Sequence, residues 1–281
     1  MKKLISTAVA MAFVGGAAVV HAAATLDTTT ATPNDGILQN FVGIDWHNNG
    51  GAWIQGFDLT TANNTGDSDT FTLTYQAFAG VINTSSLTPN LYVASPGAAT
   101  GSYELTTFAT LNETATCLNN GCTSISITTD SGFWDVFFDI SPDANQSAGT
   151  GFLDGVSILS GTFTGGLSTF IATGPIPQVG VLGTGGGFII GNVTNTNNAY
   201  INPDLLGTTF QASLQFPGQS SPTYTRPAAF NGVATGADTA SSFVIQTDAS
   251  QNFTVPEPTS LALFGIGLLG LSLVGRRRFN N

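Results

Sequence analysis

The chain has 281 residues and a formal net charge of −11, and only 8% of its residues are charged. Sixteen of its seventeen acidic residues but only one basic residue, Arg226, lie between Ala24 and Thr254, which gives this segment a net charge of −15. Such an acidic body repels nucleic acid and anionic lipid, which excludes both as binding partners of the body.

The first residues are typical of a secretory leader. Lys2 and Lys3 provide a positive start, residues 4–20 are almost all apolar or small, and alanines follow where a signal peptidase would cut. We therefore expect a signal peptide over residues 1–23 and signal peptidase as a processing partner. A retained membrane helix is the alternative, and the short apolar run without a charged stop disfavours it.

The segment 24–254 has the pattern of an all-β body. Phe71, Leu73 and Tyr75 alternate with threonines, as expected of strands with one buried and one polar face. No internal stretch keeps a 3.6-residue period. We expect an antiparallel β-sandwich or jelly-roll-like body. Further expected strands cover 103–111, 125–128, 134–140, 156–163, 169–173, 188–194, 210–216 and 243–247. Residues 174–187 and 217–227 are expected loops, and 248–255 an expected polar connector.

Two tryptophans, Trp46 and Trp53, flank a polar turn that contains His47. Indole rings among amide and carboxylate groups can stack on sugars and hydrogen-bond their hydroxyls, which makes this pair a candidate carbohydrate site. The alternative is a β-turn whose tryptophans enter the core, and we favour it.

Oxygen-rich turns are candidate calcium sites. Residues 63–69 bring Asp67 and Asp69 together with asparagine and backbone oxygens, which hard Ca²⁺ prefers, but the EF-hand pattern is incomplete. A second oxygen-rich stretch runs from Asp139 to Asp154. In both cases a solvated turn is the simpler interpretation.

The two cysteines, Cys117 and Cys122, bracket an Asn-Gly pair, which is a strong hairpin-turn signal. An oxidising compartment favours a disulfide between them. We expect this bridge to close the neck of a hairpin, in preference to a metal pair or a redox centre.

The residues needed for most catalytic sites are missing from the body, so we expect no enzyme. His47 is the only histidine after the leader, and neither a Gly-x-Ser-x-Gly elbow nor a zinc-ligand set is present. A glycosidase needs only two carboxylates, for which Asp135 and Asp139 are the candidates. Four residues along a strand place them roughly 13 Å apart, which is too far without a bulge.

The last part of the sequence carries a tripartite signal over residues 255–281. Pro256, Glu257 and Pro258 precede an apolar run from 261 to 274, and Arg276, Arg277 and Arg278 follow. We expect a short transmembrane helix whose arginines stay cytoplasmic. The body would then lie on the opposite, periplasmic side of the inner membrane.

This arrangement resembles the PEP-CTERM sorting tail of exported proteins from Gram-negative bacteria that make exopolysaccharide. The resemblance implies recognition by exosortase, a membrane-embedded cysteine transpeptidase, and removal of the helix. The implied locations are first a membrane-anchored precursor facing the periplasm and then the cell surface or extracellular matrix.

The body also resembles the PEP-CTERM group associated with flocculation, through 43–46, 143–145, 148–155 and 158–163. This similarity implies a non-catalytic role in holding cells within exopolysaccharide, in biofilms or flocs. The alternative is a carbohydrate-binding module, with or without calcium; no other cofactor is expected.

Overall fold

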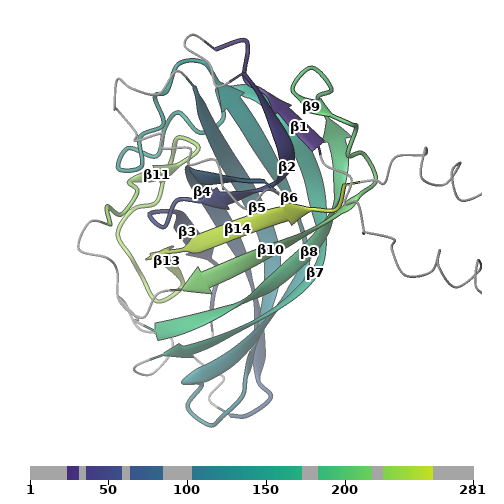
Figure 1. Cartoon of the computed structure of the whole chain (residues 1–281). Coiled ribbons are helices and arrows are strands. Elements are labelled where there is room, and N and C mark those ends of the chain that lie inside the picture. Colours follow the sequence, from purple (N-terminus) through teal and green to yellow (C-terminus); the bar gives the residue numbers. More distant parts are fainter. Residues whose placement is uncertain are drawn as a thin grey trace, which may run out of the picture. The chain divides into compact units, whose positions relative to one another are not determined.

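The protein was analysed as a computed structural model that describes residues 24–31, 36–58, 64–84, 103–172, 183–216 and 224–255. Within these ranges all regular secondary structure is β (Figure 1). The strands are β1 (Ala24–Asp27), β2 (Ile37–Trp46), β3 (Gly51–Gln55), β4 (Ser68–Thr84), β5 (Glu104–Cys117), β6 (Ser124–Asp139), β7 (Val156–Ala172), β8 (Gly183–Thr196), β9 (Ile201–Asn202), β10 (Thr209–Phe216), β11 (Ala229–Phe230), β12 (Val233–Ala234), β13 (Ser242–Gln246) and β14 (Asp248–Phe253).

Eight antiparallel strands form a closed ring. Strands β4, β5, β6, β7, β8 and β10 pair in that order, β14 follows β10, and β2 joins β14 back to β4. Figure 1 shows β14, β10, β8 and β7 side by side. Closure depends on the length of β4, because residues 72–76 pair with β3 whereas residues 79–84 pair with β2. Each strand of the ring is thereby paired on both sides along at least part of its length, which limits exposed strand edges.

The core consists of inward-facing side chains from opposite walls of this ring. Trp134 on β6 contacts Phe210 on β10, with ring centroids 4.8 Å apart, and Phe253 on β14 at 5.8 Å. Gly161 on β7 makes room for the indole, since a Cβ there would lie 2.8 Å from two of its ring carbons. The period-two pattern therefore places large rings beside small residues.

The all-β class and antiparallel pairing predicted from the sequence are confirmed. The layering differs, because the walls that a sandwich would keep in two sheets are hydrogen-bonded into one sheet through β2. The expected connector after residue 247 is instead strand β14, which lies between β10 and β2. Gly183–Gly187 was expected in a loop but begins β8, where the neighbouring backbone of β7 leaves no room for a side chain at Gly187.

Residues Ala24–Thr254 form one compact unit. In the ranges that the structure describes, no helix has the length and apolar character needed to cross a membrane. The predicted leader and the apolar tail segment lie outside those ranges.

Candidate functional site

Both tryptophans of the predicted carbohydrate site are buried. Trp46 is 4% exposed, and Trp53 is 8% exposed in a cluster with Phe230 and Val244. The indole N–H of Trp53 donates to Ser242 Oγ at 2.9 Å. With no indole face open to solvent, these residues serve the core, as the alternative interpretation of this turn anticipates.

The interior of the ring holds a small cavity, to which all eight strands of the ring contribute. Its volume is about 40 Å³, and Tyr75, Ala109 and Trp134 lie in one row of its wall. The Tyr75 hydroxyl and the Trp134 indole N–H are buried without a protein hydrogen-bond partner. A water needs roughly 10–15 Å³ of such space, so the cavity suits a few waters and is too small for a sugar.

The carboxylates of Asp67 and Asp69 are engaged in local structure. Asp67 Oδ2 accepts the backbone N–H of Asn64 at 2.9 Å, and Asp69 accepts that of Asp58. The same turn is held to the disulfide hairpin, since the Thr65 backbone N–H donates to Asn120 Oδ1 at 3.1 Å. This turn positions loops, and the described residues bring no third acidic ligand to it.

A different acidic group has the arrangement expected of a cation site. Glu104, Asp139 and Asp143 each offer a carboxylate oxygen, and these three atoms lie within 4.8 Å of one another. Glu104 begins β5 and is the register partner of Asp139 at the end of β6. The loop after β6 then returns Asp143, whose backbone N–H donates to Glu104 Oε1 at 2.9 Å.

Burial and mutual repulsion set the electrostatics of this group. Glu104 is 1% exposed, and loss of solvation raises its pKa to about 7, although the N–H groups of Asp143 and Ala144 oppose the rise. Burial and the nearby carboxylates of Asp154 and Asp139 raise the pKa of Asp143. The only Lys or Arg of segment 24–254, Arg226, is paired with Asp238. Three carboxylates without a basic partner among the described residues form a ligand set that can hold a hard cation such as Ca²⁺.

The sequence indicated part of this group. Asp139 and Asp143 belong to the second oxygen-rich stretch, but Glu104 was missed. The only signal that could have found Glu104 is the register between β5 and β6, which the sequence does not reveal.

The residues considered as catalytic candidates do not come together in the fold. Asp135 and Asp139 lie on β6, which pairs in regular register with β5 over this stretch. The nearby irregularity adds a residue to β7 instead, so the separation along β6 stays at roughly 13 Å, beyond the range of a glycosidase pair. His47 Nδ1 accepts the backbone N–H of Asn49 at 3.1 Å, and burial lowers the pKa of the ring.

The predicted disulfide is confirmed. Cys117 ends β5, Cys122 lies just before β6, and the two are bridged across the turn. Gly121 has a φ of 85°, the left-handed conformation that the Asn-Gly signal predicts.

The sorting residues Pro256, Glu257, Pro258 and the arginines lie outside the described ranges, and comparison with protein families identifies them. The fold is an all-β acidic body, and residues 254–278 match the PEP-CTERM protein-sorting motif. This sorting signal implies an exported protein that exosortase processes. The chain carries the PEP-CTERM signal predicted from the tail. Neither the curated proteins nor the solved structures that were compared contained a match.

Proposed function

We propose that this protein is a non-catalytic component of the extracellular matrix. After exosortase removes the tail, the body is retained in or on exopolysaccharide and promotes biofilm or floc formation. The observation that carries this proposal is the sorting motif at residues 254–278, attached to a charge-poor, disulfide-bridged β body. The resemblance of the body to flocculation-associated members of the PEP-CTERM group supports the same role.

Deletion of the gene tests this role. The proposal expects dispersed cells that still make their polysaccharide, with aggregation restored by the intact gene. A matched gene that lacks residues 256–281 should be exported without being sorted and should not restore aggregation. Unchanged flocs in the deletion strain would contradict the proposal.

A calcium-dependent carbohydrate-binding module is the second candidate function. The Glu104, Asp139 and Asp143 group favours it, because a bound Ca²⁺ would relieve the repulsion among these carboxylates. Calorimetry of the purified protein with Ca²⁺ tests whether the ion binds. A glycan array with and without Ca²⁺ tests whether glycan binding depends on the ion. Absence of heat at millimolar Ca²⁺ would remove this candidate and leave the matrix role intact.

A further inference from the structure

Three neighbouring strands carry no charge. Strands β7, β8 and β10 pair side by side, every residue in them is described, and none is Asp, Glu, Lys, Arg or His. Acidic residues reappear on the next strand on each side, with Asp135 on β6 opposite Ser160 and Asp248 on β14 opposite Gln215. The outward side of β7, β8 and β10, called here the neutral face, is therefore bounded by acidic strands.

Apolar side chains are exposed at the centre of the neutral face. Phe188 on β8 is 44% exposed, and its register partner Leu167 on β7 is 47% exposed. Ile190 and Ile171 extend the apolar surface along the two strands, with exposures of 43% and 57%. Exposed apolar side chains grouped in this way mark interaction sites more often than isolated ones do.

Glycines and polar side chains surround the aromatic ring. Gly186 precedes Phe188 by two residues on the same side of β8, and Gly165 pairs with Ile190, so neither position places a side chain over the apolar centre. On the β10 side, Ser213 pairs with Phe188 and Gln211 pairs with Ile190. The neutral face therefore combines the exposed phenyl ring of Phe188 with hydroxyl and amide groups in adjacent positions.

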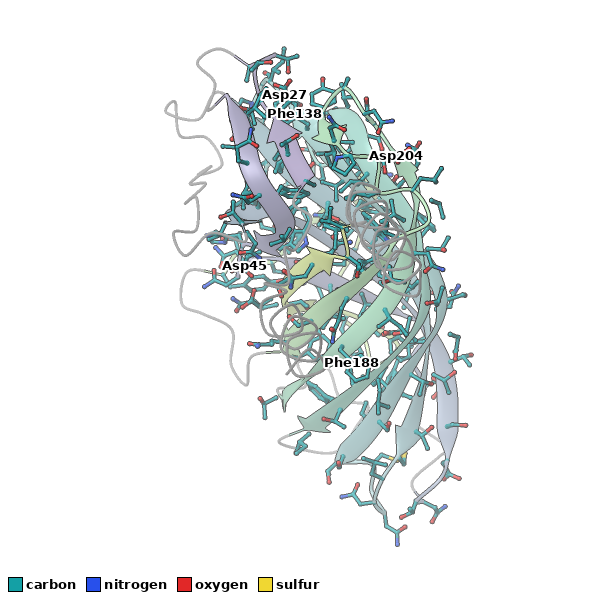
Figure 2. The ribbon with its side chains drawn as sticks, turned by 45° about the vertical axis from the view of Figure 1, so that its right-hand side comes forward. Asp27, Asp45, Phe138, Phe188 and Asp204 are labelled. Atoms are coloured by element: carbon teal, nitrogen blue, oxygen red, sulfur yellow. A yellow bond between two sulfur atoms is a disulfide. The ribbon has the colours of Figure 1, made fainter. Side chains whose placement is uncertain are left out.

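Figure 2 places Phe188 on this part of the sheet, away from the labelled acidic residues Asp27, Asp45 and Asp204. This separation matters because covering an unpaired carboxylate costs desolvation energy. A neutral partner that crosses β7, β8 and β10 covers no charged side chain of these strands.

We propose that the neutral face binds an uncharged stretch of polysaccharide. The C–H faces of sugar rings pack on Phe188 and the aliphatic side chains beside it, while Gln211 and Ser213 hydrogen-bond sugar hydroxyls. This inference rests on the proposed matrix function and assigns that function a surface. It moves the sugar-contacting role from the buried Trp46 and Trp53 to an exposed phenylalanine.

The test uses the processed protein purified from the surface of the producing cells, with exopolysaccharide from the same strain as the probe. Co-sedimentation across a protein titration gives the affinity of wild type, Phe188→Ala, Phe188→Tyr and Val233→Ala. Val233 is 58% exposed on β12 and serves as the apolar control. Truncation of an aromatic anchor should weaken binding roughly tenfold or more, whereas Phe188→Tyr and Val233→Ala should bind like wild type.

The experiment distinguishes failure of the proposed function from failure of the proposed binding surface. If wild type does not bind the polymer, the proposed function itself fails. If wild type and Phe188→Ala bind equally, the function stands and the neutral face is overturned as its site. Binding that collapses between low and physiological salt overturns the uncharged class of ligand. A wild-type dimer in sedimentation that Phe188→Ala abolishes shows that a second copy occupies the face, which also overturns the proposal.

Discussion

Glu104 lies directly opposite Asp139 in the ladder between β5 and β6, and both carboxylates converge with that of Asp143. Pairs of like charge across strands destabilise a sheet unless a proton or a cation compensates them. We therefore predict that the stability of the body depends on both Ca²⁺ and pH.

Ca²⁺ should raise the melting temperature of the protein through Glu104. Because binding to the folded state alone stabilises it, Ca²⁺ at about 100 times its Kd should add about 2.7 kcal/mol to the free energy of unfolding. Glu104→Gln should remove most of this gain, and Asp69→Asn, in the turn without a third acidic ligand, should retain it. Differential scanning calorimetry with Ca²⁺ and with a chelator measures both, and equal gains in the two variants would contradict the assignment.

The free energy of unfolding should fall as pH rises from about 5 to 8 without Ca²⁺. Burial raises the pKa of Glu113 on β5 to about 7, as it does for Glu104, so between the unfolded value near 4.5 and about 7 the folded state binds more protons. The contribution of these two groups to the free energy of unfolding is therefore fully present below pH 4.5. It is lost as the pH rises through about 7, where the groups ionise in the folded state. Urea denaturation at several pH values measures the slope.

Glu113→Gln isolates one of these groups. Its carboxylate accepts the Thr129 hydroxyl at 3.0 Å, which a glutamine oxygen can also do. The variant should be more stable than wild type at pH 8, by on the order of 1–3 kcal/mol, and close to wild type at pH 5. An unchanged pH slope would show that Glu113 ionises normally in the fold.

Loss of the disulfide should have a moderate effect. The bridge closes a short loop, for which chain entropy gives about 2 kcal/mol, and the β5 and β6 ladder beyond it is long. Cys117→Ser with Cys122→Ser should lower the free energy of unfolding by that amount without abolishing folding. Alkylation followed by intact mass measurement should find two reactive thiols in wild type after reduction and none before it.

Gly161→Ala should destabilise the ring. The added methyl would meet the backbone carbonyl of Asn192 and the indole of Trp134. Overpacking of this kind costs about 1–3 kcal/mol. Gly207→Ala separates steric overlap from backbone strain as the cause of destabilisation. Gly207 lies at a turn with open space around it but has a φ of 76°, so the cost of its substitution comes from backbone conformation alone. Equal unfolding free energies for Gly161→Ala and wild type would show that the β8 backbone at Asn192 and the Trp134 indole shift to admit the methyl.

The sequence predicts strands well where apolar residues alternate, as Phe71, Leu73 and Tyr75 do in β4. It misses β14 because the inward position of this strand at Gln251 is polar, and it misses the start of β8 because glycines replace the alternating side chains there. Closure of the ring and the meeting of Glu104 with Asp139 depend on register between strands, which local patterns do not encode. The turn at Cys117 and Cys122 was predictable because turn chemistry is local.

The central claim, that this is an exosortase-sorted protein retained in the matrix, is tested most directly by intact mass spectrometry of the protein from fractionated wild-type cells and from a strain without exosortase. The account predicts a wild-type species in the polysaccharide fraction that lacks both the leader and the apolar tail, and a mutant species in the membrane fraction that retains residues 256–281. A chain of the same mass, with its tail intact, in the same fraction of both strains would contradict it.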